Sequence, residues 1–352
     1  MEMTVTNHSM AADETDAHNS ADFARTDESD DSFFYAKDRM VSHLDSTALN
    51  TVERIIGSLV VEDQPAILDL MASWDSHIPP TLKPKRVAGL GMNPNELQAN
   101  QALSERVIHD LNQDPRLPFE DASFEVVLNT VSVDYLIRPV EVFAEVARVL
   151  KPGGLHLVIF SNRWFESKVT RIWRETGEAE RALLVEDWLK AAGGFGEARA
   201  FVSKNKPRPS DDKYAHLNIP SDPVYAVFAD RLGGDPARPP RPLPGREKSA
   251  RPKQDLKALA AQVAQDHACP YCGEKLKKWE VPQTPFTEWD LDYMYVCFND
   301  VCPYLVGGWE EMGRQGNLGS SYRLMFNPES KTLMPMAVPS LSTAKDGIID
   351  DD

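Results

Sequence analysis

The sequence predicts an α/β fold: a doubly wound, mostly parallel seven-stranded sheet, followed by a small β-rich domain. Runs of β-forming residues alternate with helical patterns along residues 32–231, which is typical of a parallel sheet with helices on both faces. The segment Leu117–Phe160 contains one complete β-α-β unit. All four cysteines of the 352-residue chain follow a proline-rich segment, so the region that holds them is expected to fold separately.

The first part of the sheet domain is predicted from short apolar runs. A helical pattern extends from about Asp45 to Leu59. Strands are expected at Ala66–Leu70, at Arg86–Leu90 and at Arg106–Ile108, because each is a short run rich in apolar and β-branched residues. These segments supply the first half of the sheet.

The β-α-β unit supplies the centre of the sheet. Phe124–Thr130 is rich in β-formers and predicts a strand. In Val140–Leu150 the apolar residues recur at three- and four-residue steps, which places them on one helix face. Lys151 begins a Lys-Pro-Gly-Gly turn. Leu155–Phe160 is then a nearly unbroken apolar run, as expected for a strand buried on both sheet faces.

The sheet domain closes with one helix and two strands. Val185–Ala192 predicts a helix that ends at Gly193. Glu197–Val202 and Val224–Ala229 are the last strand candidates. With these elements the domain is expected to occupy residues 32–231.

The net charge of −16 is concentrated at the two ends of the chain. Residues 1–31 carry nine Asp or Glu against one Arg, and residues 345–352 carry four Asp against one Lys. Such acidic segments cannot bury enough apolar surface to fold, so 1–31 and 341–352 are expected to be disordered tails. Residues 232–253 hold six Pro and six Lys or Arg, which predicts a stiff basic linker before a domain at 254–340.

The composition also bears on location. The chain is 42% hydrophobic and 26% charged, which is ordinary for a soluble protein. No apolar run approaches the ~20 residues that a membrane helix needs, and the N-terminus lacks the apolar core of a signal peptide. A cytoplasmic protein without a membrane partner is therefore expected.

The four cysteines form two pairs, CPYC at Cys269 and Cys272 and CFNDVC at Cys297 and Cys302, with twenty-four residues between the pairs. Paired thiolates at such spacing come from two tight turns and close a tetrahedral zinc site. Four cysteine ligands leave no open position, so one structural Zn2+ is expected. The alternative is four reduced, buried thiols, which the paired spacing does not favour.

The rest of the second domain is expected to be a zinc ribbon. A short helix at Asp255–Ala264 leads into it. The large aromatic residues, among them Trp279, Trp309 and Phe326, are expected to build a small core that lacks helices. The second cysteine pair resembles the second knuckle of the Ogr/Delta-type zinc finger of phage transcription activators. That resemblance implies a module that binds a partner, either protein or nucleic acid.

The β-α-β unit carries a second resemblance. The sequence LPFEDASFEVVL, which begins at Leu117, and the sequence RVLKPGG, which begins at Arg148, resemble class I S-adenosylmethionine-dependent methyltransferases of the type 11 kind. The resemblance implies a Rossmann-like fold in which the strand at Val224–Ala229 is antiparallel. It also implies S-adenosylmethionine as cofactor and a methyl acceptor that is a small molecule or a protein.

The resemblance further implies a cofactor site, which in a doubly wound sheet lies beyond the carboxyl ends of the strands. Asp69 stands where the family has an acid after the first strand, and Met71–Asp75 replace its glycine-rich loop. Gly91 stands where the family has an acid that binds the ribose, with Asn93 or Glu96 as substitutes. The implied cofactor-binding residues are Asp69, Met71, Ser73, Asn93, Asp110, Leu111 and Asn129.

Residues just past other strand ends are candidates for acceptor binding or catalysis: Asp134, Tyr135, Asn162 and Arg163. Asn and Asp at such positions also serve as caps and turn residues. Three functions are consistent with the sequence. The first is a methyltransferase of unknown acceptor whose zinc ribbon recruits a partner or substrate. The second is a methyltransferase-like scaffold that no longer catalyses, and the third is a nucleic-acid-binding regulator that acts through the zinc ribbon.

Overall fold

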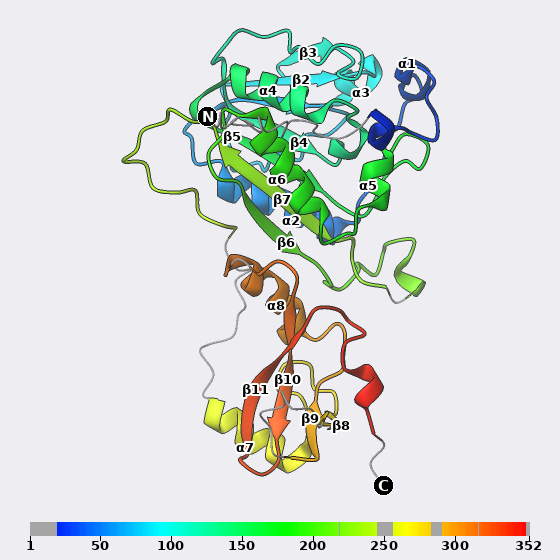
Figure 1. The fold of residues 1–352 in the computed structure, drawn as a ribbon, viewed down its shortest axis with the longest axis vertical. Coiled ribbons are helices and arrows are strands. Elements are labelled where there is room, and N and C mark those ends of the chain that lie inside the picture. The colour runs from blue at the N-terminus through cyan, green and yellow to red at the C-terminus, as the bar shows by residue number, and fades with distance from the viewer. Residues whose placement is uncertain (1–19, 218, 245–255, 283–290, 316, 350–352) are drawn as a thin grey trace, which may run out of the picture.

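The computed structural model describes residues 20–217, 219–244, 256–282, 291–315 and 317–349. These residues form two domains, one built on a seven-stranded sheet and one on a four-stranded sheet (Figure 1). The predicted fold class, a doubly wound sheet followed by a small β-rich domain, is confirmed.

The large sheet has the strand order β3-β2-β1-β4-β5-β7-β6. Strands β1 to β5 run parallel, whereas β7 lies antiparallel to both of its neighbours. Each strand that the sequence predicted is present within one or two residues of its expected start, apart from β5. The strands are β1 (Ala66–Leu70), β2 (Arg86–Gly91), β3 (Glu105–Ile108), β4 (Phe124–Thr130), β5 (Leu150–Phe160), β6 (Arg199–Ser203) and β7 (Val224–Asp230).

Helices cover both faces of this sheet (Figure 1). Helices α4 and α6 pack on one face, and α2 packs on the other. Successive residues of β4 point to opposite faces, so Val127 joins the core under α4 while Val126 joins the core under α2. The helices are α1 (Asp31–Tyr35), α2 (Ser46–Leu59), α3 (Pro94–Ala99), α4 (Pro139–Val149), α5 (Arg171–Glu175) and α6 (Arg181–Ala192).

The join between α4 and β5 differs from the prediction. Strand β5 begins at Leu150, so the Lys-Pro-Gly-Gly residues lie inside the strand rather than in a turn before it. Pairing with β4 shifts register between Phe124 and Val126, and Gly153 has a φ of 75°. The strand accommodates proline and glycine as a local irregularity, because a bulge provides positions without a ladder hydrogen bond and with positive φ.

Residues 20–31 pack on the sheet domain, although the sequence predicted a tail there. Lys168 is fully buried, lies 3.0 Å from the Asp31 carboxylate and donates to the Ser29 carbonyl at 2.8 Å. Arg25 forms a second ion pair with Asp31 at 2.7 Å. The acidic side chains are therefore partners of cations in the fold, a relationship that composition alone does not reveal. Residues 1–19 of the predicted tail lie outside the described residues.

The first part of the predicted linker also packs on the sheet domain. Arg241 is buried, donates to the Leu59 carbonyl at 2.9 Å and contacts the Glu62 carboxylate at 3.0 Å. Arg241, a basic residue of a proline-rich segment, is therefore buried in the sheet domain and is not exposed to solvent. Residues 245–253 of the predicted linker lie outside the described residues.

The second domain has an antiparallel sheet of order β11-β10-β9-β8. The expectation that it lacks helices beyond the first is wrong, because Pro303–Arg314 forms the twelve-residue helix α8. The sequence does not predict α8 because glycines stand in its middle and glycine is a poor helix former. The described part of the predicted acidic tail packs here too, and the Ile349 N–H donates to Lys278 at 3.0 Å. The elements are α7 (Leu256–Asp266), β8 (Lys277–Glu280), β9 (Tyr293–Val296), α8, β10 (Ser321–Asn327) and β11 (Thr332–Val338).

Candidate functional site

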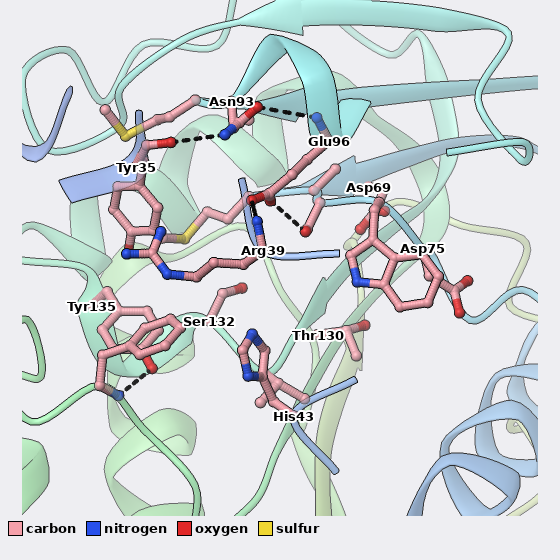
Figure 2. Close-up of a pocket in the computed structure, with 18 of the residues that line it drawn as sticks. Tyr35, Arg39, His43, Asp69, Asp75, Asn93, Glu96, Thr130, Ser132 and Tyr135 are labelled. Atoms are coloured by element: carbon pink, nitrogen blue, oxygen red, sulfur yellow. Dashed lines mark hydrogen bonds between the residues drawn. The ribbon is translucent and has the colours of Figure 1, made fainter. Parts of the chain in front are cut away.

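A pocket opens at the carboxyl ends of strands β1, β2 and β4 (Figure 2). It encloses about 1210 Å3, including its open mouth. The loops that follow these strands form its floor, and side chains from the segment 31–44 form a further wall. This is the place where doubly wound sheets bind their ligands.

Asp69 lines the pocket near the end of β1. Its side chain is buried and accepts a hydrogen bond from Ser76. Burial raises the pKa of Asp69 to about 6, because loss of solvent disfavours the charged form. A cationic ligand beside this carboxylate would restore its charge and would be held by it.

The loop after β1 takes a tight path without glycine. Met71 has a φ of 58°, in the left-handed region, at the position where the resemblance implies a glycine. The Ala72 N–H donates to the Leu90 carbonyl at 2.8 Å, and the Asn100 side chain donates to the Ser73 carbonyl at 2.9 Å. The loop is therefore fastened to the neighbouring strand, and Met71 and Ser73 both line the pocket.

Gly91 ends β2 directly beneath this loop. A Cβ atom at this position would lie 2.2 Å from the Ala72 carbonyl oxygen, which is closer than any side chain tolerates. An acid at position 91 is thus excluded by the path of the loop. The path of the loop after β1 therefore requires glycine at position 91.

The two predicted substitutes for that acid differ in their availability. Asn93 lines the pocket but caps α3, since its oxygen accepts the Glu96 N–H at 3.0 Å and its amide donates to the Tyr35 carbonyl at 3.0 Å. The Glu96 carboxylate accepts hydrogen bonds from the Ser73 hydroxyl at 2.6 Å and from the Arg39 N–H at 2.7 Å (Figure 2). Glu96 is therefore the residue that presents an acid at this side of the pocket.

Asp110 and Leu111 line the pocket beyond β3. The Asp110 carboxylate accepts the N–H of Asn112 at 2.9 Å. The Asn112 amide in turn donates to the Asp31 carboxylate at 2.9 Å and to the Tyr135 carbonyl at 3.0 Å. This end of the pocket is thereby tied both to the N-terminal segment and to the turn after β4.

The remaining wall is aromatic, and most of it was not foreseen. Between centroids, the Phe165 ring lies 5.1 Å from the His43 ring and 5.7 Å from the Tyr135 ring. The Arg39 guanidinium lies 5.2 Å from the centroid of the Phe165 ring. Partial loss of solvent contact and the nearby Arg39 charge lower the pKa of His43. Of these residues only Tyr135 was predicted. Tyr35, Arg39 and His43 precede the first strand, where no motif marks them.

Two predicted residues lie beneath the pocket rather than on its surface. Asn129 is fully buried and donates to the Ser132 hydroxyl at 3.1 Å. Asp134 is buried, and burial raises its pKa to about 7. Asp134 accepts a hydrogen bond from the Tyr135 hydroxyl, which itself accepts the Phe165 N–H at 2.8 Å. Its contribution is to orient the aromatic wall.

Asn162 and Arg163, the other two predicted residues past strand ends, line a second pocket, which encloses about 800 Å3 including its open mouth. Arg163 is paired there with the buried Asp222 at 2.8 Å, and Arg208 contacts the same carboxylate at 2.7 Å. The structure does not bring Asn162 and Arg163 to the first pocket.

The four cysteines converge in the second domain. The Sγ atoms of Cys269 and Cys302 are 3.8 Å apart, those of Cys272 and Cys297 are 3.6 Å apart, and all four lie within 4.8 Å of one another. A tetrahedral zinc ion with Zn–S bonds of about 2.3 Å requires Sγ separations of about 3.8 Å. The cluster is compatible with zinc binding.

The strand order, the antiparallel β7 and the pocket at the strand ends give the first domain a Rossmann-like fold of the kind that methyltransferases have. Residues 76–158 match the family model of a methyltransferase domain. The sterol 4-C-methyltransferase strm-1 of Caenorhabditis elegans is 33% identical over 79 residues, which are 21% of this chain and 24% of that protein. The chain thus spans about a quarter of the length of this curated relative.

Similar solved structures share less sequence with the chain. A chain in the complex between the Haloferax volcanii Trm112 methyltransferase activator and a methyltransferase is 18% identical, over 53% of this chain and 91% of that chain, with a TM-score of 0.37. The geranyl diphosphate C-methyltransferase of Streptomyces coelicolor A3(2) is 13% identical, over 52% of this chain and 77% of that chain, with a TM-score of 0.35. Within the described residues, no helix is both long and apolar enough to cross a membrane.

Proposed function

We propose that the protein is an S-adenosylmethionine-dependent methyltransferase with a zinc-bound C-terminal domain. The observation that carries this proposal is the placement of two acids, Asp69 and Glu96, in one pocket at the strand ends of a methyltransferase domain. Both are buried, so each would interact strongly with the polar groups of a bound ligand.

The pocket has suitable partners for each part of this cofactor. Asp69 offers a carboxylate to the cationic methionine portion, beside the small side chain of Ser73. Glu96 offers the acceptor that ribose hydroxyls need, and Asp110 offers one to the adenine amino group next to the apolar Leu111. When bound, the cofactor supplies a methyl group on a positively charged sulfur, which an acceptor atom attacks.

The chain's own residues would contribute mainly by positioning the two reactants and excluding water. Tyr35, Tyr135 and Phe165 provide a flat, apolar wall for the body of the acceptor. His43 lies on the same wall and, with its lowered pKa, is largely neutral at pH 7, so its ring can take a proton from an acceptor hydroxyl or amine.

Titration calorimetry with S-adenosylmethionine tests the proposal. We expect Asp69→Asn and Glu96→Gln each to weaken binding about tenfold or more, since each removes a buried charge from the contact. Asp121→Asn, which removes an exposed charge far from the pocket, is the matched control. No detectable binding at millimolar cofactor would refute the proposal that the protein is an S-adenosylmethionine-dependent enzyme.

A second candidate function is a methyltransferase-like scaffold without catalysis. It is favoured by one observation: both oxygens of Glu96 already accept hydrogen bonds from the protein, from Ser73 and from Arg39. A ribose would then have to share or displace these donors. The calorimetric titration separates the two functions, because a scaffold of this kind has no affinity for the cofactor.

We further propose that the cysteine cluster holds one zinc ion as a structural element, since four thiolates complete a tetrahedral shell. The domain around it would then recruit or position a partner or the acceptor. Metal analysis of the purified chain is expected to give one zinc per molecule. A C-terminal domain that is fully folded without metal would contradict this.

A further inference from the structure

Helix α8 of the second domain lies against the outer strand of the large sheet (Figure 1). That strand, β6, is last in the strand order and pairs only with β7 among the described strands. A free strand edge presents N–H and C=O groups that can pair with other chains, and proteins protect such edges with a helix or loop. The position of α8 suits this protective role.

The two sides of α8 contact different sheets. A Cβ atom on Gly308 would lie 2.2 Å from the Ser321 hydroxyl, so this residue faces β10 of the second domain. A Cβ atom on Gly313 would lie 3.7 Å from the Val202 side chain, so this residue faces β6 of the first. Gly308 costs about 1 kcal/mol in the helix interior, and this cost is offset by its close approach to β10.

A buried acid connects the two domains at this contact. The Glu310 carboxylate lies 2.7 Å from the Arg54 guanidinium of α2, 3.4 Å from the Lys206 ammonium after β6 and 3.4 Å from the Arg314 guanidinium of its own helix. A buried carboxylate needs such partners to stay charged. Two of its three cations belong to the first domain, so docking of the domains is what satisfies this acid.

Aromatic and main-chain contacts complete the interface. Trp309 is buried, and the Lys204 ammonium lies 3.7 Å from the centroid of its ring, a cation–π contact. The Arg314 guanidinium also donates to the Pro244 carbonyl at 3.1 Å, in the segment that leaves the first domain. The helix therefore binds the first domain along its second half.

The first turn of the same helix begins at the cysteine cluster. Cys302 is the residue that precedes α8, and the Val306 N–H donates to its carbonyl at 2.9 Å. A metal bound by Cys302 would fix the start of the helix whose second half carries Trp309, Glu310 and Gly313. The metal site and the domain interface are thus two ends of one rigid element.

We infer that the four-cysteine domain is a built-in structural partner of the methyltransferase domain. Metal at the cysteines holds α8 in place, and α8 stabilises β6 against local opening. The inference goes beyond the proposed activity, because it holds whether or not the cofactor binds. It also leaves α8 unavailable to an external partner, so any recruitment would use another surface of the domain.

Amide hydrogen exchange of the full-length, zinc-loaded chain tests this inference. In Glu310→Gln we expect the amides of residues 199–203 to exchange about tenfold faster or more, with zinc content unchanged, because the interface loses its central charge. Residues 86–91, in β2 far from the interface, should not change. Glu311→Gln is the matched control, since it removes the neighbouring charge, which lies 3.3 Å from the Arg314 guanidinium of the same helix.

Removal of zinc from the unmodified chain by a chelator under reducing conditions is the second arm. We expect the same acceleration at residues 199–203, reversed when zinc is added back. Zinc loss without any change at residues 199–203 would overturn the inference. A Glu310→Gln protein whose exchange at residues 199–203 matches that of Glu311→Gln would also overturn it. If the zinc-free chain unfolds, the comparison of these two variants is the deciding measurement.

Discussion

The carbonyl oxygen of Ala72 lies only 2.2 Å from the point at which a side chain on Gly91 would begin. The loop after β1 rests on the end of β2, where the Ala72 N–H donates to the Leu90 carbonyl at 2.8 Å. On the path that this loop takes, a side chain at position 91 would overlap the Ala72 carbonyl. Glu96, in the first turn of α3, presents a carboxylate on this side of the pocket.

Returning the family's acid to position 91 is therefore expected to harm the protein. Gly91→Asp should lower stability by about 1–3 kcal/mol and reduce cofactor binding, because the new side chain must displace the loop that lines the pocket. Thermal unfolding and calorimetry measure both effects. Gly307→Asp is the control, since a Cβ atom there meets nothing within 4 Å. A Gly91→Asp protein of unchanged stability and higher affinity for the cofactor would contradict the claim that the loop at Ala72 requires glycine at position 91.

Much of the fold could be predicted from the sequence because its strands are short apolar runs bounded by turn residues. Strands β1 and β4 fall at their predicted limits, Ala66–Leu70 and Phe124–Thr130. Helix α8 was missed because Gly307 and Gly308 interrupt its pattern, and the close approach of Gly308 to Ser321 of β10 is a long-range contact. The helix propensities of single residues do not depend on such contacts and cannot predict them.

The candidate site was predicted only where it lies on strand ends. Asp69 lies near the end of β1 and Asp110 follows β3, and both line the pocket. Arg39 and His43 could not be foreseen, because they reach the pocket through tertiary packing of a segment with no motif. The charge pattern of residues 1–31 was misleading for a related reason, since its acids pair with cations from distant parts of the chain.

The affinity for S-adenosylmethionine is expected to depend on pH through Asp69. Burial raises the pKa of this carboxyl to about 6, and the cationic cofactor favours the charged form. Affinity should therefore be full above pH 7 and fall as the pH drops through 6, by up to about tenfold per pH unit. Calorimetry between pH 5 and pH 8 measures the slope. Asp69→Asn should flatten it, and an equally steep slope in that variant would assign the effect to another group.

Asp31 is expected to be important for stability, although it belongs to a segment that resembles a tail. Its buried carboxylate contacts Lys168 at 3.0 Å and Arg25 at 2.7 Å. Asp31→Asn leaves two buried cations without their shared partner, which costs about 3–5 kcal/mol. Asp30→Asn changes an exposed helix cap at which Asn and Asp serve equally well, so it should leave the free energy of unfolding almost unchanged. Urea unfolding of the two variants compares them, and equal losses would show that the Asp31 pairs contribute little.

His156 is expected to make the sheet domain sensitive to acid. It lies in the middle of β5, fully buried, with its ring 4.7 Å from Phe143 and 5.6 Å from Phe195 between centroids. Neither ring nitrogen has a hydrogen-bond partner among the described residues. Burial lowers the pKa of His156 from 6.5 to about 3. The imidazole is therefore neutral in the folded protein across the whole range in which the unfolded chain takes up a proton.

Because only the unfolded state binds that proton between pH 6.5 and about 3, the free energy of unfolding should fall as the pH decreases through this window. The slope due to His156 is up to about 1.4 kcal/mol per pH unit. His156→Leu removes it, so urea unfolding at pH 7.5, 6 and 5 should show a flatter dependence than in the unmodified chain. Asp69 and Asp134 titrate in both proteins and cancel in the comparison. The exposed His216→Leu is the control, and a His156→Leu protein that loses stability in acid as steeply as this control would rule out the buried imidazole as the cause.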